Sequence, residues 1–413
     1  MDKKPEKLVP EVRFKGFTDD WEQHKLGDIT IPIKTYPYTR KYETKNITKF
    51  KYIHYGDIHT GKAKKINEPS KLPSITKGNY STLRNGDVVV ADASEDYKGI
   101  ADAAILLSTG AFSIIAGLHT IAFRPNRKLV FPMFIYYNLQ TSRFKHYGYH
   151  VGTGLKVFGI SSNLFFDYSA FHPSLIEQQE ISKLIESLEN LLSLQQRKLE
   201  QLRQLKIFSL QRMFIDKDCK QPILRFKNFN DNWLPHKFND IANTFSGGTP
   251  AISNKDYYGG NIPFIRSAEI NKNTTQLHLT PDGLKNSSAK FIKKGTLLYA
   301  LYGATSGEVG IAQIDGAINQ AVMAINLKKD NVYFIKTWLI KNKRKIISTY
   351  LQGGQGNLSA KIVKHLKLSL PKIEEENLIS ITIMKIDSLI KLQQSKIDQL
   401  TILKKYLLQK LFI

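Results

Sequence analysis

The chain has 413 residues, enough for two or three domains, and its apolar content of 42% is that of an ordinary soluble protein. No stretch reaches the roughly 18 uninterrupted apolar residues of a membrane span, and the first residues lack the apolar core of a secretory signal. A single cysteine, Cys219, excludes an internal disulfide framework. We therefore expect a cytoplasmic protein without a membrane partner. The net charge of +24, from 60 Lys and Arg against 36 Asp and Glu, indicates a polyanionic partner, most often nucleic acid.

The first element is a segment at residues 10–29, PEVRFKGFTDDWEQHKLGDI, which recurs at residues 222–241 as PILRFKNFNDNWLPHKFNDI. Most of its basic, aromatic and acidic positions keep their spacing, beginning with Arg13 and Arg225. The chain is thus a tandem repeat with a period of about 200 residues, and each repeat consists of an entry segment, a domain and a helix.

Within the two domains, short apolar runs recur and predict strands. KYIHYGDIH (51–59) matches PFIRSAEIN (263–271), an extended segment followed by an acidic residue, and RNGDVVVADA (84–93) matches KKGTLLYALY (293–302), a glycine turn into a strand. Another strand is expected at GIADAAIL and GIAQIDGAI, and each domain ends on a glycine loop, HVGTGLKVFGIS or LQGGQGNLSAKI. Elsewhere the halves differ, which indicates one framework that displays two sets of loops; neutral drift after duplication would give the same contrast.

A long amphipathic helix is predicted at residues 173–214, because apolar residues stand three and four apart with no internal Gly or Pro. Pro173 suits the first turn, Ser174 can cap the helix, and Glu177 completes a capping box. About 40 residues at about 1.5 Å each give a helix about 60 Å long. Its expected coiled-coil seam consists of Ile181, Ile185, Leu188, Leu192, Leu199 and Leu202.

A second helix is predicted at residues 371–412, which align with the first without a gap. Both copies interrupt the seam with a glutamine, Gln195 and Gln393, a device that can fix the register of a coiled coil. Since the first helix ends at the entrance of the second domain and the second begins at its exit, we expect antiparallel helices, a pseudo-twofold relation between the domains, and Ile413 close to the start of the chain. The predicted division is 1–172 (entry segment and first domain), 173–214 (first long helix), 215–370 (linker and second domain) and 371–413 (second long helix).

Motifs of DNA-modifying and nucleotide-binding enzymes are missing from the sequence. There is no N-P-P-Y-like or D-P-P-Y-like tetrapeptide of an amino-methyltransferase, and no glycine run carries a P-loop lysine or leads a strand into a nucleotide-binding helix. Asp92 with Asp96 and Lys98 is a pattern that a nuclease could use, and it is short enough to arise by chance. His54 and His59 lack a third ligand at a metal-binding spacing, so we expect polar surface or DNA-contacting roles and no metal.

Two variable domains, each introduced by an R-F-K-x-F-type segment and separated by duplicated helices that begin with a proline and an acidic residue, resemble the specificity subunit of type I restriction-modification systems. The resemblance covers essentially the whole chain. It implies an α+β fold with two pseudo-twofold-related α/β target-recognition domains, separated by two long antiparallel helices that form a coiled coil. Each domain would read one half of a bipartite site in double-stranded DNA.

The resemblance also implies partners. Two modification (methyltransferase) subunits would bind the helices and carry S-adenosylmethionine, and restriction (translocase-nuclease) subunits would use ATP and Mg. The chain itself would be non-catalytic and hold no cofactor.

Base contacts are expected from polar, aromatic and basic side chains in the loops that differ between the domains. Arg and Lys favour guanine edges and Asn and Gln favour adenine, whereas other side chains would hold phosphates. The candidates in the first domain are Tyr36, Tyr38, Arg40, Lys41, His54, Tyr55, Tyr97, Lys98, Thr153 and Lys156. The candidates in the second domain are Thr249, Ser253, Lys255, Tyr257, Arg266, Ser267, Tyr302, Thr305, Gln355 and Asn357.

Two other interpretations stay open at this stage. The chain could be a fragment of a self-contained restriction enzyme, which predicts DNA cleavage or methyl transfer by the purified chain alone. It could also be a coiled-coil interaction protein with an incidental charge, which predicts no tight, salt-sensitive retention of DNA in the partner complex. The bases read, the gap between half-sites and the methylated adenines do not follow from the sequence.

Overall fold

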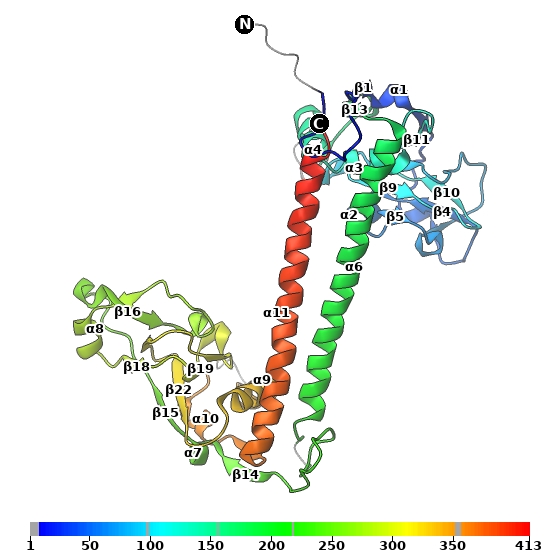
Figure 1. Ribbon diagram of the computed structural model, residues 1–413. Helices are drawn as coiled ribbons and strands as arrows, with labels where there is room; N and C mark the ends of the chain where they lie inside the picture. The colour runs from blue at the N-terminus through cyan, green and yellow to red at the C-terminus, as the bar shows by residue number, and fades with distance from the viewer. Residues whose placement is uncertain (1–7, 96–98, 155–156, 217–218, 352–356) are drawn as a thin grey trace. The chain divides into compact units, whose positions relative to one another are not determined.

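The computed structural model describes residues 8–95, 99–154, 157–216, 219–351 and 357–413 (Figure 1). Contacts divide the chain into two compact units. The first unit runs from the start of the chain to Gln196 and adds Ser395–Ile413, and the second comprises Arg197–Gln394. Each unit therefore contains one β-rich domain and part of each long helix, α6 (Leu175–Arg212) and α11 (Ile373–Lys410).

The first domain contains a five-stranded sheet of order β2-β11-β7-β9-β5 and a four-stranded sheet of order β10-β4-β6-β3. Strand β7 (Val88–Ala91) is the central strand of the first sheet. Its four apolar residues are all buried, as suits a strand that is covered on both faces. The strands are β1 (Glu22–Lys25), β2 (Thr30–Ile33), β3 (Glu43–Thr44), β4 (Phe50–Ile53), β5 (Lys65–Ile66), β6 (Ser74–Ile75), β7, β8 (Ala93–Ser94), β9 (Ala103–Leu106), β10 (Ser113–Ala116), β11 (Thr120–Pro125), β12 (Phe158–Gly159) and β13 (Ser169–His172). The helices are α1 (Leu26–Ile29), α2 (Tyr55–His59), α3 (Pro132–Asn138), α4 (Ser142–Val151) and α5 (Ser162–Phe166), with 3-10 turns at Arg40–Tyr42 and Pro69–Lys71.

The second domain contains two four-stranded sheets, of order β15-β22-β19-β20 and β17-β16-β21-β18. The strands are β14 (Leu234–Lys237), β15 (Ala242–Ser246), β16 (Tyr258–Ile265), β17 (His278–Leu279), β18 (Lys290–Ile292), β19 (Leu297–Ala300), β20 (Val309–Ile311), β21 (Gly316–Ile318), β22 (Val322–Leu327) and β23 (Lys367–Leu370). The helices are α7 (Phe238–Ile241), α8 (Pro281–Lys285), α9 (Val332–Tyr350) and α10 (Ala360–Lys364), with 3-10 turns at Lys255–Tyr257, Ser267–Glu269 and Gly303–Thr305.

The two domains share one framework, as the sequence repeat predicted. In each, the strand of the entry segment pairs antiparallel with the strand before the long helix, β1 with β13 and β14 with β23. The expected strands at 84–93 and 293–302 are β7 and β19, which pair with β11 and β22. The domains also share an equivalent parallel pair, β4 with β10 in the first and β16 with β21 in the second, and the first domain has a further parallel pair, β5 with β9. One expectation was too simple, because GIAQIDGAI contains parts of two strands, β20 and β21.

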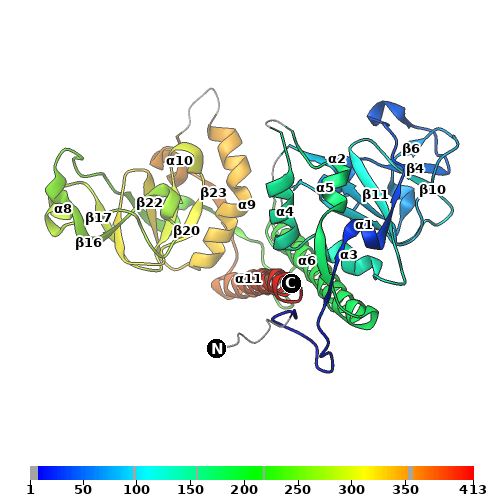
Figure 2. The same ribbon diagram turned by 90° about the horizontal axis from the view of Figure 1, so that it is seen from above.

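The long helices are anchored in the domain cores by equivalent aromatic contacts. In the first unit, the Phe412 ring lies 5.0 Å from Phe134 of α3, and Ile181 and Ile185 of α6 belong to the same core. In the second unit, the Phe214 ring lies 4.9 Å from Phe334 of α9. Helix α9 packs across α11 there (Figure 2), and Ile379 and Ile383 of α11 complete that core.

Helices α6 and α11 pack antiparallel in both units. In the first unit, Lys404 Nζ lies 2.6 Å from Glu189 Oε1. In the second unit, Lys206 Nζ lies 2.6 Å from Asp387 Oδ1. From the first pair to the second, the residue number on α6 rises and the residue number on α11 falls by the same amount, so both pairs belong to one antiparallel register. The predicted mixed α+β fold, with two β-rich domains and two long antiparallel helices, is therefore confirmed.

Two details of the helix prediction need correction. Ser174 caps α6 as expected, since its Oγ accepts from the Glu177 N–H at 3.4 Å, whereas Pro173 precedes the helix. The Glu177 carboxylate does not complete a capping box; it accepts from Arg13 Nε and Nη2 at 2.7 and 2.8 Å. The corresponding pair in the second unit is Arg225 with Glu375, at 2.8 Å for both bonds.

The chain ends meet inside the first unit. The Val12 N–H donates to the Lys410 carbonyl at 3.0 Å, at the end of α11. The equivalent bond in the second unit joins Leu224 N–H to the Arg212 carbonyl at 2.8 Å, at the end of α6. The expectation that the end of the chain returns to its start is thereby confirmed. Among the described segments, no helix combines the length and apolarity that crossing a membrane requires.

Candidate nucleic-acid interface

Several of the candidate residues follow strand ends that meet at one edge of the sheets in each domain. In the first domain, His54 and Tyr55 follow β4, Asp92 follows β7, and residues 117–119 join β10 to β11. These positions share an edge because β4 and β10 are parallel and Thr120 of β11 is paired with Ala91 of β7. The same strand ends in the second domain are followed by Arg266, by Tyr302 and by residues 319–321. The framework therefore brings loops that are distant in sequence to one edge.

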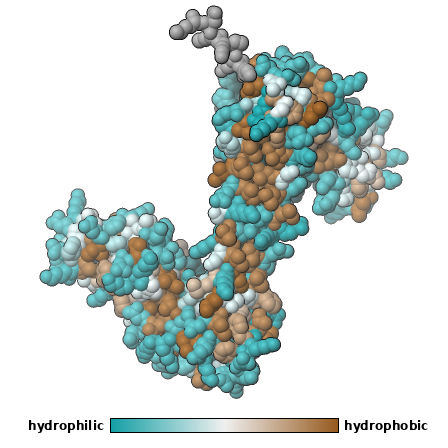
Figure 3. All heavy atoms as spheres, in the orientation of Figure 1, coloured by the Kyte–Doolittle hydropathy of each residue, from teal (hydrophilic) through white to brown (hydrophobic). Residues whose placement is uncertain are grey.

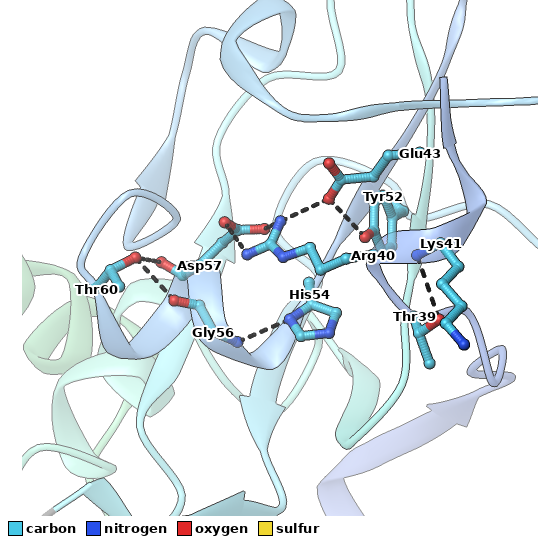
Figure 4. Close-up of polar contacts among 9 residues, drawn as sticks. All are labelled: Thr39, Arg40, Lys41, Glu43, Tyr52, His54, Gly56, Asp57 and Thr60. Carbon is cyan, nitrogen blue, oxygen red and sulfur yellow. Dashed lines mark hydrogen bonds and ion pairs between the residues drawn. The ribbon is translucent and has the colours of Figure 1, made fainter. Parts of the chain in front are cut away.

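Arg40 is fixed at this edge by two carboxylates (Figure 4). Its Nη1 donates to Glu43 Oε1 at 2.7 Å and to Asp57 Oδ2 at 3.1 Å, and its Nη2 donates to Asp57 Oδ1 at 2.8 Å. Asp57 is the acidic residue that follows the extended segment in the sequence repeat, and its side chain is only 3% exposed. The Tyr52 hydroxyl donates to Glu43 at 2.8 Å and completes the cluster.

The ionisation of the cluster follows from these contacts. Although burial opposes it, hydrogen bonds from Arg40 and Tyr52 lower the pKa of Glu43, so this carboxyl is suited to pair with the positive charge of Arg40. Burial, and then the positive charge of Arg40, lower the pKa of His54. His54 is buried and its Nδ1 accepts from the Gly56 N–H at 3.1 Å. It caps α2 from inside the domain instead of facing solvent.

Tyr55 lies among three histidines at the same edge. Its ring centroid is 4.5 Å from that of His54, 6.0 Å from His59 and 5.4 Å from His119. His59 is held between Asp102 Oδ2 at 3.3 Å and the Ala93 carbonyl at 2.9 Å, and the hydrogen bond to Asp102 raises its pKa. Neither nitrogen of His59 is therefore available, so His59 has a structural role.

His119 is a residue that the sequence gave no reason to select. It is exposed, has a φ of +56°, and its Nδ1 lies 3.3 Å from Asp92 Oδ1. A positive φ is unusual for a residue with a side chain and often marks a functional position. Its counterpart turn in the second domain holds Gln320, also exposed and also missed. Only their place before the strand that pairs with β7 or β19 could have indicated them.

Tyr36 and Tyr38 belong to a half-buried aromatic cluster. Their rings lie 5.9 Å apart, the Tyr38 ring stacks on Tyr42 at 4.6 Å, and the Tyr36 ring lies 5.2 Å from Tyr80. Tyr42 is 52% exposed and was not among the candidates. The cluster packs on Tyr52, which connects it to the Arg40 site.

The remaining candidates of the first domain differ in what the structure shows. Lys41 is exposed next to Arg40, and its backbone N–H donates to Thr39 Oγ1. Thr153 is exposed and is paired through its backbone with Gly159, both bonds being 2.9 Å. Tyr97, Lys98, Lys156 and, in the second domain, Gln355 lie outside the described residues.

Arg266 in the second domain follows β16 as His54 follows β4, and its guanidinium donates three side-chain hydrogen bonds, as that of Arg40 does, but through a different edge. Its Nε donates to Glu269 Oε2 at 3.1 Å, and its Nη2 donates to Glu269 Oε1 at 3.2 Å and to Gln276 Oε1 at 2.9 Å. Glu269 is the counterpart of Asp57 and is equally buried, at 4% for the side chain. Ser267 begins the 3-10 turn that carries this acid.

Two further groups of candidates complete the edge of the second domain. Tyr302 is bridged to Asn357, whose Oδ1 accepts from the Gly303 N–H at 3.2 Å, and Thr305 Oγ1 donates to the Tyr302 carbonyl at 3.2 Å. Thr249 donates to Gln320 Oε1 at 2.6 Å. The exposed Ser253 and Lys255 and the half-buried Tyr257 lie on the segment that follows Thr249. The structure therefore brings Tyr302, Thr305 and Asn357 together and ties Thr249 to the missed residue Gln320.

Asp92, the described residue of the nuclease-like pattern, lies beside a histidine, His119. Burial raises the pKa of Asp92, and its nearest titratable neighbour is His119. Asp96 and Lys98, the other two residues of the nuclease-like pattern, lie outside the described residues. Within the described part of the chain, no three His, Cys, Asp or Glu side chains are grouped to hold a metal ion.

Comparison with known proteins gives consistent matches. Residues 230–401 match the family described as the type I restriction modification DNA specificity domain. A protein assigned as the type I restriction enzyme MjaX specificity subunit of Methanocaldococcus jannaschii is 23% identical over 409 residues, which cover 95% of this chain and 93% of that protein.

Solved structures show the same fold. The type I restriction-modification S subunit from M. genitalium has a TM-score of 0.59 and 14% identity and covers 98% of this chain and 99% of its own. A chain from a structure on complex assembly and conformational transition of the type I R-M system has a TM-score of 0.59 and 16% identity, with 95% and 97% covered. Residues 230–401 therefore belong to the family of type I restriction modification DNA specificity domains, and over nearly its whole length the chain is similar in sequence and fold to specificity subunits of type I restriction-modification systems.

Proposed function

We propose that each domain of this chain reads one half of a bipartite site in double-stranded DNA, and that the two long helices set the spacing of the half-sites and bind two modification subunits. The observation that carries the proposal is one framework, used twice, whose equivalent edges hold different side chains. Arg40, Tyr55 and His119 occupy the edge of the first domain, whereas Arg266, Tyr302 and Gln320 occupy that of the second. Two copies with different side chains suit two different half-sites.

The domain exchange is the direct test. Residues 21–172 are replaced by the equivalent domain of a relative, and the methylated sequence is determined by sequencing DNA from cells that carry the whole system. We expect one half-site to change and the other to stay. If both half-sites changed together, independent reading by the two domains would be wrong.

The helices carry exposed apolar residues that support the docking role. After packing against each other, they leave leucine and aromatic side chains in solvent at positions that recur in both copies: Leu191 with Leu389, Leu194 with Leu392, Leu205 with Leu403 and Phe208 with Tyr406. Figure 3 shows hydrophobic atoms gathered over the long helices. By this pairing, each unit carries two of the residues from α6 and two from α11. Side chains of this kind are enriched where a protein partner binds, and two equivalent sets fit two copies of one partner.

A single substitution can test the docking role. Leu194 is 59% exposed, so Leu194→Asp disturbs the surface and leaves the packing between the helices intact. We expect a complex with one modification subunit where the unaltered chain binds two, as measured by mass photometry. Ser193→Asp is the matched control, because the neighbouring side chain points about 100° away around the helix. Two bound modification subunits on the Leu194→Asp variant would argue against this surface.

Restriction subunits and cytoplasmic placement complete the proposal. We propose both because specificity subunits of type I systems work with such partners, and in that family the partner subunits hold S-adenosylmethionine, ATP and Mg. The purified chain alone should neither cleave DNA nor transfer methyl groups, and cleavage by the pure chain would favour the restriction-enzyme interpretation.

A further inference from the structure

We propose that Arg40 reads a guanine in the half-site recognised by the first domain, through the edge of its guanidinium group formed by Nε and Nη2. The inference rests on the proposed function and goes beyond it by assigning one base and one pair of donor atoms to one side chain.

The hydrogen bonds of Arg40 leave one edge of the guanidinium unused. Nη1 donates one hydrogen to Glu43 and the other to Asp57, and Nη2 donates one of its two hydrogens to Asp57. The second hydrogen of Nη2 and the hydrogen of Nε point in the same direction in a planar guanidinium. Among the described residues, none accepts from Nε of Arg40. A pair of parallel donors is therefore available to a ligand.

The surroundings of Arg40 hold this edge in place and keep it open. The Asp57 carboxylate is buried and accepts two bonds from the end of the guanidinium, so releasing Arg40 would leave a buried charge unpaired. The Arg40 side chain is nevertheless 46% exposed. Gly56 lies next to Nη2, where a Cβ would stand 3.6 Å away, and its lack of a side chain leaves that space open. Because the fold already holds the donor pair in place, a ligand that binds it does not have to order this side chain, and little conformational entropy is lost on binding.

Guanine is the base that matches two parallel donors. In the major groove it presents two acceptors, N7 and O6, side by side, whereas adenine presents N7 beside an amino donor. A phosphate group can also accept two bonds from an arginine, and this is the alternative that the experiment must separate.

The second domain provides an internal comparison. Arg266 uses the Nε and Nη2 edge on Glu269 and gives its further Nη2 hydrogen to Gln276. The edge that is free in Arg40 is therefore occupied in Arg266. The same substitution made at each arginine should therefore change the first half-site only when it is made at Arg40.

The test uses the complex of the full chain with its modification subunits and a duplex that contains the methylated site found by sequencing. Binding is measured for the cognate duplex, for duplexes with each guanine of the first half-site changed to adenine, and for duplexes in which each guanine is replaced by 7-deazaguanine. The proteins are the unaltered chain, Arg40→Lys and the control Arg266→Lys. Arg40→Lys keeps a positive charge beside Asp57 and removes the paired donors.

For the unaltered complex, we expect one position at which the loss of N7 weakens binding and the change to adenine weakens it by roughly 5- to 150-fold. Arg40→Lys should abolish the discrimination at that position alone, and Arg266→Lys, in the other domain, should change no position of the first half-site. The proposal is overturned if no guanine of the first half-site depends on N7 in the unaltered complex, or if Arg40→Lys weakens cognate and altered duplexes equally, as loss of a phosphate contact would. The 7-deazaguanine series on the unaltered complex can refute the proposal even if the variant folds poorly, because the proposal requires a guanine of the first half-site that depends on N7. Failure of the proposed function would be distinct, because the exchange of residues 21–172 would then change both half-sites together.

Discussion

Glu376 offers a sharp test of how burial affects stability in this chain, because the other half of the repeat has an amide at the same position. Glu376 is 1% exposed, and its Oε2 accepts from the Asn331 N–H at 2.8 Å. The equivalent Gln178 is fully buried; its Oε1 accepts from the Phe131 N–H at 2.8 Å, and its Nε2 donates to the Leu129 and Pro173 carbonyls. Burial, opposed by the Asn331 bond and by Lys329 and reinforced by Asp330, raises the pKa of Glu376 to about 7.

The direction of the pH effect follows from the raised pKa. The folded chain retains a proton on Glu376 that the unfolded chain loses above its ordinary pKa of 4.5, so stability decreases as pH rises from about 4.5 to about 7 and is constant above that. At about 1.4 kcal/mol per unit, the ionised carboxyl costs up to about 3 kcal/mol at pH 8. Glu376→Gln removes this titration and supplies the amide that the first unit uses.

The assay is urea unfolding of the full chain at pH 5 and pH 8, followed by tryptophan fluorescence. We expect Glu376→Gln to unfold close to the unaltered chain at pH 5 and to be more stable by about 2–3 kcal/mol at pH 8. The reciprocal change Gln178→Glu is the matched control and should destabilise the chain more at pH 8 than at pH 5. If Glu376→Gln brought the same change in stability at both pH values, the reasoning from burial would be refuted.

Three further predictions concern the long helices. Adding one heptad to each helix, after Gln201 and after Gln399, lengthens each by about 10 Å and preserves the seven-residue seam, so the gap between half-sites should grow by up to about three base pairs; methylation of the original site by a folded variant would contradict this. A circular permutant that is opened between Asp216 and Lys220, with its original ends joined by a short linker, should keep its specificity, because the bond from Val12 to Lys410 already holds the entry segment beside the end of α11. A folded permutant that no longer binds modification subunits would contradict this prediction. Glu189→Gln weakens the bonds from Lys404, Lys65 and Tyr137 and should lower stability by about 1–2 kcal/mol at pH 7 but little at acid pH, where the carboxylate is protonated; an equal loss at both pH values in urea unfolding would exclude an ionic role.

The repeat, the long helices and the α+β architecture could be predicted because each leaves a local or periodic signal. Apolar spacing determines which face of a helix is buried, and Ile181, Ile185 and Leu188 are buried as the spacing predicted. Periodicity says nothing about partners across the fold. The sequence drew attention to the two glutamines, yet the charged contacts between the helices come from Glu189 with Lys404 and Asp387 with Lys206, pairs whose members are about 200 residues apart.

The candidate site was harder to predict because exposure and pairing are decided by tertiary contacts. Arg40 and Arg266 look alike in the sequence, and only the structure shows that Glu269 and Gln276 occupy the edge that Arg40 leaves free. His54 is a polar residue in a loop, but its Nδ1 is used to cap α2. His119 was missed since neither its unusual φ nor its proximity to Asp92 can be read from neighbouring residues.

The bonds at the ends of the long helices show which interactions define the fold. Leu224 bonds to Arg212 across a short covalent connection, whereas Val12 makes the equivalent bond to Lys410 although the two residues lie at opposite ends of the chain. The paired arginines and glutamates repeat the same pattern, Arg13 with Glu177 and Arg225 with Glu375. Since identical contacts form with and without the covalent link, the contacts themselves must place the entry segment on the helix end. An entry segment that carries its own docking contacts allows a domain to be exchanged without redesigning the helices, which is the property that a protein needs if its two recognition domains are to change independently.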